Sequence, residues 1–428
     1  MARLFKLANP VKHYEWGSPR YIPELIGTPS PDGSPWAELW MGCHPASPSH
    51  SGGVSLGQII AEDPIRCLGE KTARKYGTLP FLFKLLAAAS PLSIQAHPNE
   101  AQAREGFERE NRLGLPLDAP NRSYKDPNHK PELLCALTPF TGMCGFRAPD
   151  EINDLISNYF TRRHGGTENN AQYVKDSLSS VSLCLCERSL GNRLRNFLNA
   201  LFNLSDEARK AITEFILSHE PPSSPPCLRA SVPPCEEKGT NSPEWGLMRL
   251  FAELYPGDPA VIAPLYLNVF HLEPGEAIFL EAGVLHSYIS GFAVELMANS
   301  DNVLRGGLTG KHVDIPELLN ITGFYPQKPR IIRPAATDSF TYPAPCEEFS
   351  LTVMRGKSGE ANTFPVAAAQ DSPAICIVTD GEAIFADSGG GETVLKQGES
   401  AFIPPAALGE PPLSVRGHFT LYSASCPL

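Results

Sequence analysis

The sequence predicts a mainly β protein made of two jelly rolls, with a helical segment inserted into the first roll. Three observations support this prediction. The 42 prolines and 35 glycines punctuate short apolar runs, a pattern typical of strands joined by frequent turns. The pattern becomes helical in the middle of the chain and returns to strands afterwards. At 428 residues, the chain is also too long for one ordinary hydrophobic core.

The first roll is expected to consist of two parts, residues 1–148 and 263–328. Residues 79–97 have the character of two buried strands. Residues 263–297 repeat that character, with a turn at Pro274–Gly275 between the first two apolar runs. The two parts would therefore frame the helical segment.

Residues 149–262 form the predicted helical insertion. Asp150 is a candidate N-cap for a helix that begins at Glu151. Ser205 is a candidate N-cap for residues 206–217, whose first turn is acidic, as the helix dipole favours. The proline-rich residues 221–234 predict a disordered surface loop.

Residues 329–428 are expected to form the second jelly roll. Residues 374–385 predict a strand, a turn and a second strand, and residues 392–395 and 400–404 predict two more. We expect no metal ligand in this roll.

Charge and composition exclude several functional classes. The net charge of −11 argues against a general nucleic-acid binder, which would be basic. No run approaches the roughly 20 apolar residues of a membrane helix, and the first residues lack a secretory signal. The eleven scattered cysteines are typical of reduced thiols, with Cys184 and Cys186 spaced wrongly for a Cys-x-x-Cys motif. We therefore expect a cytoplasmic protein, and we expect a monomer.

Four side chains predict a metal site with nitrogen and oxygen ligands. Gln95 and His97 are two apart in a predicted strand, so they should share one face. Glu132 lies beside a proline between buried runs, and His286 follows a glycine turn. Two imidazoles, one carboxylate and one amide oxygen suit a borderline divalent ion, Zn²⁺ first.

Each of these residues also has an ordinary structural interpretation. A single histidine in a β protein is more often a hydrogen-bonded core or surface residue than a ligand, and a single glutamate is usually solvated. The combination of four favours a site. Three histidines with a glutamate would instead indicate an iron or manganese dioxygenase, and Gln95 in place of the first histidine argues against such redox chemistry.

A weak internal repeat is consistent with two related rolls. The segment from Gly275 to His286 resembles the second motif of the cupin superfamily, Gly-x5-Pro-x-Gly-x2-His, with Glu281 in the proline place. Gly398 and Pro404 begin the same motif again. There Ala406 stands for the second glycine and Gly409 for the histidine. Only the first copy would keep a ligand.

Six longer segments closely resemble the type I mannose-6-phosphate isomerases, in order along the chain. They are residues 11–17 (VKHYEWG), 37–45 (AELWMGCHP), 79–84 (LPFLFK), 91–98 (PLSIQAHP), 128–132 (NHKPE) and 301–309 (DNVLRGGLT). The C-terminal third of the chain resembles the family in style alone.

The resemblance implies a zinc-dependent interconversion of mannose 6-phosphate and fructose 6-phosphate on a cupin scaffold, which would feed GDP-mannose synthesis. It puts the zinc ligands on Gln95, His97, Glu132 and His286, and the catalytic arginine on Arg305. The other active-site positions that it implies are Ser93, Lys84, Lys130, Glu295 and Tyr288.

The chemistry of isomerisation indicates which of these residues could transfer the proton and which could bind the substrate. A proton must move between C1 and C2 of the sugar, which needs a base and a group that polarises oxygen. We expect Lys130 or Glu295 to transfer the proton, ahead of His129 and Tyr288. Because an arginine stays charged, Arg305 should stabilise anionic oxygen. The candidates for binding the substrate phosphate are Arg305, Lys84, Ser93 and Lys311, and the sequence does not assign one contact to each. Trp16 is expected in the core or pocket wall.

Two residues depart from the family pattern. Glu100 stands where the family usually has a lysine, and Gly310 stands where it usually has a proline. Neither is a ligand, so both bear on rate and affinity. A catalytically silent sugar-phosphate sensor and an iron cupin oxygenase are the two alternative functions.

Overall fold

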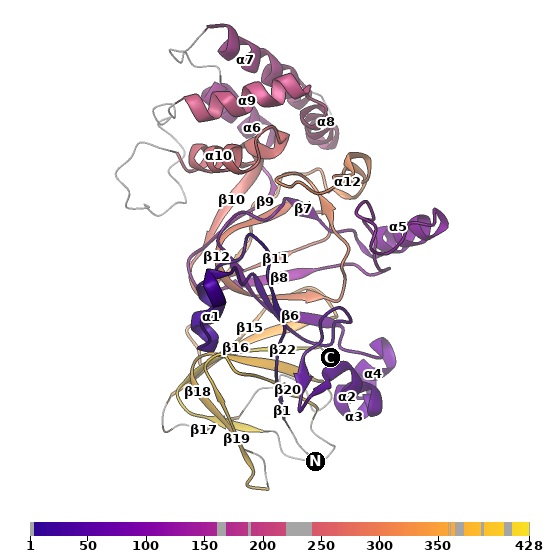
Figure 1. Cartoon of the computed structure of the whole chain (residues 1–428), viewed down its shortest axis with the longest axis vertical. Helices are drawn as coiled ribbons and strands as arrows, with labels where there is room; N and C mark the ends of the chain where they lie inside the picture. Colours follow the sequence, from indigo (N-terminus) through magenta and orange to yellow (C-terminus); the bar gives the residue numbers. More distant parts are fainter. Residues whose placement is uncertain are drawn as a thin grey trace.

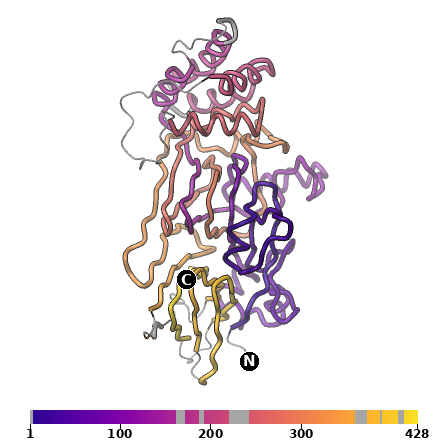
Figure 2. Tube along the Cα trace, turned by 60° about the vertical axis from the view of Figure 1, so that its left-hand side comes forward, coloured from indigo at the N-terminus to yellow at the C-terminus, as the bar shows by residue number. Residues whose placement is uncertain are grey.

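The computed structural model describes residues 4–160, 168–186, 190–219, 242–357, 359, 361–363, 372–386, 389–405 and 413–427. These residues form three tiers along the long axis of the molecule (Figure 1). Helices form one end, a large sheet forms the middle and a second sheet forms the other end, and Figure 2 shows the same order after rotation. The predicted loop over residues 221–234 lies outside the described residues.

The middle tier is a sheet that has eleven strands within the described residues, in the order β14-β11-β8-β12-β6-β3-β2, with β7, β9, β10 and β13 attached at its side. Its strands are β2 (Val11–Lys12), β3 (Glu38–Met41), β6 (Phe81–Ala88), β7 (Gln95–Ala96), β8 (Glu132–Ala136), β9 (Phe140–Phe146), β10 (Leu267–Leu272), β11 (Ala277–Leu280), β12 (His286–Ala298), β13 (Leu304–Arg305) and β14 (Ile331–Ile332). Strands from before and after the helical tier therefore pair in one sheet.

The second sheet has nine strands within the described residues, along the path β1-β20-β18-β22-β16-β15 with β17, β19 and β21 attached. Its strands are β1 (Phe5–Leu7), β15 (Ser339–Tyr342), β16 (Ser350–Gly356), β17 (Ala361–Thr363), β18 (Ala374–Ala386), β19 (Glu392–Lys396), β20 (Ser400–Ile403), β21 (Ser414–Arg416) and β22 (Phe419–Ser425). Because β1 pairs with β20, the first strand of the chain completes the sheet made by its last residues. A small hairpin is formed by β4 (His50–Ser51) and β5 (Val54–Ser55).

The helical tier contains α6 (Pro149–Phe160), α7 (Glu168–Leu183), η2 (Cys184–Cys186), α8 (Leu190–Phe202), α9 (Asp206–Ser218), α10 (Pro243–Leu254), η3 (Pro259–Ile262) and α11 (Ala263–Tyr266). Outside that tier lie α1 (Tyr21–Ile26), η1 (Pro31–Gly33), α2 (Leu56–Glu62), α3 (Pro64–Leu68), α4 (Glu70–Tyr76), α5 (Glu100–Arg112) and α12 (Ile315–Ile321). The helices from α1 to α5 were not predicted from the sequence. Among the described residues, no helix is both long enough and apolar enough to cross a membrane.

The alternating residues of β6 show how the two sheets share a hydrophobic core. Along β6, Phe81, Phe83 and Leu85 pack in a core shared with Leu351 and Val353 of the second sheet. The alternate residues of β6 face the interior of the first roll, as the period of two requires. One face of this sheet thus joins the two rolls, and the other face is free to line a site.

The starts of two helices and one strand can be compared with the predictions from the sequence. Ser205 caps α9 as predicted, since its hydroxyl accepts a hydrogen bond from the backbone N–H of Ala208 at 3.2 Å. Asp150 is not the residue before its helix, because α6 already begins at Pro149, and a proline is well suited to a first helical position. Residues 263–266 are helical, and the predicted strand begins only at Leu267.

The turn predicted within residues 374–385 is wrong, because β18 runs unbroken from Ala374 to Ala386. A register shift between Val378 and Asp380 takes the place of the turn. Gly381 follows with φ of +73°, and such a bulge bends a strand without ending it. Residues 406 and 409 of the sequence repeat lie outside the described residues.

Candidate metal centre and active site

Three buried side chains meet in the interior of the first roll. One ligating atom each from His97, Glu132 and His286 lies within 4.8 Å of the others, and all three residues are buried. His97 follows β7, Glu132 begins β8 and His286 begins β12. Ends of three neighbouring strands therefore bring together side chains that are up to 189 residues apart, since His286 and His97 differ by that number.

Both imidazoles are oriented by backbone carbonyl groups. Nδ1 of His97 lies 2.7 Å from the carbonyl oxygen of Asn302, and Nδ1 of His286 lies 2.8 Å from that of Val284. Because a carbonyl oxygen only accepts, each Nδ1 carries the proton. Burial, together with the charge of Lys130, lowers the pKa of His97 to about 4, so this ring is neutral at pH 7. The Nε2 atom of His97 is then a lone-pair donor, and the tautomer that has its proton on Nδ1 gives His286 a lone pair on Nε2 as well.

Both lone pairs point at a carboxylate. His97 Nε2 lies 3.2 Å from one oxygen of Glu132, and His286 Nε2 lies 3.4 Å from the other. These distances fall within ion-pair range, yet neither nitrogen has a hydrogen-bond partner. Because the His97 ring is neutral, its Nε2 atom faces the carboxylate as a lone pair and forms no ion pair with it. Buried lone pairs that face one another repel unless a cation lies between them, so these residues fit a divalent metal ion.

Glu132 is held in its charged form. Burial opposes its ionisation, but the ammonium of Lys130 lowers the pKa of Glu132. The Nζ atom of Lys130 lies 3.3 Å from one carboxylate oxygen. The hydroxyl of Tyr288 donates to the other at 3.3 Å, and burial raises the pKa of Tyr288 well above its usual value, which keeps it a neutral donor.

Gln95 shares a row of the sheet with two other predicted site residues. It lies directly opposite His286 on β12 and directly opposite Arg305 on β13. Side chains of directly opposite residues project to the same face, with Cβ atoms roughly 5 Å apart. The row therefore places the amide between the His286 imidazole and the Arg305 side chain.

The curvature of β12 brings both ends of this strand to the same interior. Its register shifts between Tyr288 and Ser290, and Gly291 follows with φ of +127°. A Cβ atom at Gly291 would lie 2.6 Å from a ring carbon of Phe140, so glycine alone fits. Past this bulge the strand pairs with β6 and β8, which brings Glu295 opposite Lys84.

Lys84 is buried between two carboxylates. Its Nζ atom lies 3.1 Å from Glu295 and 3.5 Å from Glu38, and it is 5.4 Å from the centre of the Trp40 ring. Burial disfavours its charge, but Glu295 and Glu38 raise the pKa of Lys84 above its usual value, so it stays an ammonium. Burial raises the pKa of Glu295, against the opposing effect of Lys84.

The remaining predicted residues lie at the margin of this cluster. Arg305 is half-buried, burial lowers its pKa, and no carboxylate of the described chain pairs with it. Partial desolvation and the charges of Arg305 and Lys125 lower the pKa of Lys311, which is exposed. Ser93 is half-buried. Trp16 stacks on Tyr14 with ring centres 5.6 Å apart, beside the interior core of the roll.

Sequence reasoning missed Glu38 as a neighbour of this cluster. Glu38 accepts a hydrogen bond from the indole N–H of Trp40 at 2.8 Å and pairs with Lys84. It interrupts the apolar strand at residues 37–41, just as Lys84 interrupts β6. A charged residue within an apolar strand is unusual, and this signal, which pointed to Lys84, is present at Glu38 as well. Asn302, which orients His97 through its backbone, leaves no such signal.

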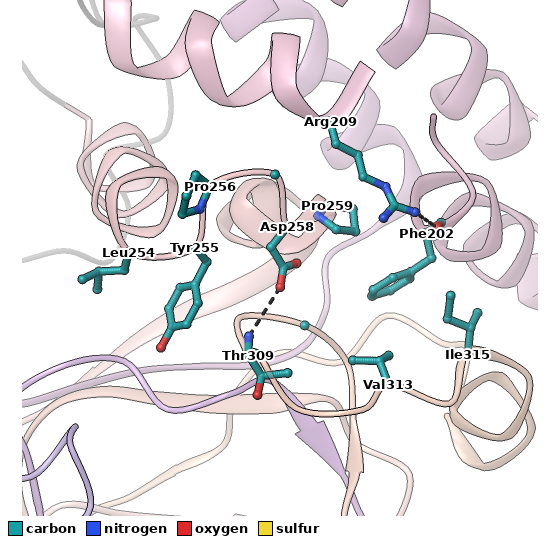
Figure 3. A pocket seen from close by; sticks show the side chains of 13 residues that line it. Phe202, Arg209, Leu254, Tyr255, Pro256, Asp258, Pro259, Thr309, Val313 and Ile315 are labelled. Carbon is teal, nitrogen blue, oxygen red and sulfur yellow. Dashed lines mark hydrogen bonds between the residues drawn. The ribbon is translucent and has the colours of Figure 1, made fainter. Parts of the chain in front are cut away.

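A pocket lies between the helical tier and the loop that follows Arg305. It has a volume of about 570 Å³ and lies between α9, η3 and the loop that follows Arg305 (Figure 3). Arg209, Asp258 and Thr309 are among its polar lining residues, and none of the three residues His97, Glu132 and His286 lines it. Gly307 and Thr309, which lie in the loop that follows Arg305, are among its lining residues.

Comparisons with known proteins agree with this geometry. The family described as "Phosphomannose isomerase type I, catalytic domain" matches residues 4–149. The mannose-6-phosphate isomerase of Escherichia coli is 39% identical over 421 residues, which is 96% of this chain and 97% of that protein. The human mannose-6-phosphate isomerase is 32% identical, and the match covers 89% of this chain and 88% of that protein.

Solved structures give the same result. The apo form of mannose 6-phosphate isomerase from Salmonella typhimurium superposes with a TM-score of 0.84 and 37% identity, and all of both chains is covered. A zinc-bound mannose 6-phosphate isomerase superposes with a TM-score of 0.82 at 36% identity, again over all of both chains. With a mainly β, cupin-like fold and relatives matched over nearly their whole length, this chain belongs to the type I phosphomannose isomerases.

Proposed function

We propose that this protein is a zinc-dependent isomerase that interconverts mannose 6-phosphate and fructose 6-phosphate. One observation carries the proposal: two buried imidazole nitrogens that lack a hydrogen-bond partner converge on a buried carboxylate. Membership of the phosphomannose isomerase family supports the substrate, and the zinc-bound relative supports the metal.

Gln95, His97, Glu132 and His286 would hold the zinc ion. Two imidazole nitrogens, a carboxylate and an amide oxygen are suitable zinc ligands, and carbonyl partners fix both rings from behind. Bound zinc would supply Lewis-acid polarisation of a sugar oxygen. The neutral amide of Gln95 leaves a single carboxylate in this set.

Lys130 and Glu295 are the candidates for moving the proton between C1 and C2. A raised pKa suits Glu295 to take up a proton and return it near neutral pH, provided that Lys84 stays an ammonium beside it. Lys130 is the alternative, since it contacts the ligand Glu132. Tyr288 would act as a neutral hydrogen-bond donor.

Arg305 and Lys311 are two cations at the margin of the site, and no carboxylate of the described residues pairs with either. A permanent guanidinium on the row of Gln95 would stabilise negative charge on a sugar oxygen or on the phosphate. Ser93 and Lys84 are further phosphate partners. Trp16 would form part of the pocket wall, where its stack on Tyr14 offers an apolar face to the sugar.

The wider setting is also part of the proposal. Free thiols throughout the described residues support a reducing compartment, and we propose the cytoplasm. We propose a monomer that feeds GDP-mannose synthesis and contacts neither nucleic acid nor membrane. The domain division at residues 148, 262 and 328 belongs to the same proposal.

An assay of both sugar phosphates tests this function. Purified protein should convert mannose 6-phosphate to fructose 6-phosphate, and Arg305→Ala should lower turnover strongly, whereas near-normal turnover would contradict the assigned role. Tight sugar-phosphate binding without turnover would favour the sensor. Iron content with oxygen uptake would favour the oxygenase.

A further inference from the structure

Asp258 connects the helical tier to the loop that follows Arg305. One carboxylate oxygen accepts a hydrogen bond from the backbone N–H of Ala260 at 2.8 Å and so caps η3. The other oxygen lies 3.4 Å from the backbone nitrogen of Thr309, the contact drawn as a dashed line in Figure 3. A single side chain thus holds two segments that are 51 residues apart.

The opposite side of the same loop is held by the strand of a proposed zinc ligand. The backbone N–H of Ile94 donates to the carbonyl oxygen of Gly307 at 3.0 Å, and that of Gly306 donates to Ile94 at 2.7 Å. Ile94 immediately precedes Gln95. The loop is therefore held between the metal site and Asp258.

The conformation of the loop depends on these contacts. Gly307 has φ of +109°, and a Cβ atom there would lie 2.4 Å from Ala260 and 3.0 Å from the carboxylate of Asp258. Leu308 has φ of +51°, which is unusual for a residue other than glycine, and its side chain is buried. Such strained residues persist where surrounding contacts fix them.

The carboxylate of Asp258 interacts mainly with backbone N–H groups. Within the described chain it forms no ion pair, while backbone N–H groups of Ala260, Thr309 and Leu308 oppose the effect of burial, which raises the pKa of Asp258. The guanidinium of Arg209, which lines the same pocket, bonds to the carbonyl oxygen of Phe202, and its charge lowers the pKa of Asp258 without forming an ion pair. Fixing the loop is therefore the function of Asp258 that the contacts support.

We propose that Asp258 is a positioning residue that sets the place of Arg305 and Lys311 through the loop at residues 306–309. The inference rests on the proposed function, in which these two cations meet the anionic substrate. Arg305 directly precedes the loop and Lys311 follows it, with its backbone N–H bound to the hydroxyl of Thr309 at 3.1 Å. A shift at Thr309 would move both.

Two variants separate the cap from the loop contact. Asp258→Asn and Asp258→Ser keep a side-chain oxygen that can cap η3, and all three residue types are good N-caps. Both lose the second oxygen that accepts from Thr309. We expect kcat/KM for mannose 6-phosphate to fall about 10-fold in each, mainly through a higher KM, because small misplacements of binding groups are costly.

A matched control is Asp63→Asn, since Asp63 caps α3 through the N–H of Arg66 at 3.2 Å and is remote from the loop. Its kcat and KM should stay within about 2-fold of the original values. Binding of inorganic phosphate, measured by calorimetry, should weaken about 10-fold in the two Asp258 variants and stay unchanged in the control.

These readouts distinguish positioning from stability, because loss of folded protein lowers kcat without changing KM or phosphate affinity. Folded Asp258 variants with unchanged KM and phosphate affinity would overturn the inference. If the unaltered protein binds phosphate but does not isomerise mannose 6-phosphate, the proposed function fails, and phosphate affinity alone still tests Asp258.

Discussion

Lys84 and Glu295 lie directly opposite each other on β6 and β12, with Nζ and Oε2 3.1 Å apart in the closed interior of the first roll. The two residues are 211 positions apart in sequence. Glu38 completes the arrangement at 3.5 Å. One buried cation therefore compensates two buried carboxylates beside the proposed zinc ligands.

Replacing Lys84 with methionine should destabilise the fold. Lys84→Met leaves Glu295 and Glu38 buried without a cation, so the free energy of unfolding should fall by about 3–5 kcal/mol. Adding Glu295→Gln should recover part of that loss, and chemical denaturation of the single and double variants measures it. The control is Lys75→Met, since the exposed pair of Lys75 with Glu347 should be worth less than about 1 kcal/mol. Equal losses in the two lysine variants would contradict the assigned burial.

Removing the charge of Glu132 should abolish stabilisation by zinc. Glu132→Gln keeps the shape of the side chain but removes the one carboxylate facing both Nε2 atoms. We expect zinc affinity to fall more than about 100-fold, because an uncompensated buried charge costs about 3 kcal/mol or more. Thermal unfolding with and without zinc measures this, since a ligand that binds the native state raises Tm. Exposed Glu281→Gln is the control, and a zinc response retained in Glu132→Gln would exclude Glu132 as a ligand.

Adding a charge at Gln95 should slow turnover without removing zinc. Gln95→Glu would put a second carboxylate in the ligand set and weaken the Lewis acidity of the metal. Zinc content and kcat, measured on the same sample, check this prediction. Gln58→Glu is a suitable control, because Gln58 belongs to the capping box of α2, where glutamate also fits. Unchanged turnover in Gln95→Glu would show that the neutrality of the amide is incidental.

The pair of His129 and Glu348 should make stability depend on pH. His129 Nε2 lies 2.9 Å from a carboxylate oxygen of Glu348, the hydrogen bond raises the pKa of His129, and the pKa of Glu348 is lowered against the effect of burial. The histidine contribution is full below its unfolded pKa of about 6.5 and is lost as pH rises through the folded value. The glutamate contribution is present above its unfolded pKa of about 4.3 and is lost as pH falls through the folded value.

His129→Gln should therefore reduce stability most between about pH 5 and 6.5, by about 1 kcal/mol, with a smaller difference above that range. Urea denaturation at a series of pH values, with Glu348→Gln as the matched variant, tests the pair. A loss that is the same at all pH values would mean that the histidine acts through packing.

The convergence of His97, Glu132 and His286 could be predicted, because ligand-type residues in buried surroundings leave a local signal. Lys84 was found the same way, as a charge within an apolar strand. Its pairing with Glu295 could not be predicted, since register between distant strands depends on the whole sheet. The catalytic and binding roles remain predictions.

In the fold, too, features that depend on adjacent residues could be predicted, and features that depend on distant strands could not. Ser205 caps α9 as predicted, because an N-cap depends on a few adjacent residues. The turn predicted near Gly381 is a bulge, because β18 pairs with β20 and β22 on one side of it and with β19 and β21 on the other. Neighbouring strands, rather than the glycine, decide that the strand continues.

Zinc content and isomerase activity, measured on the same preparations before and after chelation, test the central claim most directly. We predict one zinc ion per chain, conversion of mannose 6-phosphate to fructose 6-phosphate, loss of both on chelation, and recovery of both when zinc is returned. Full turnover by zinc-free protein, or a zinc-loaded protein that leaves mannose 6-phosphate unchanged, would contradict the account.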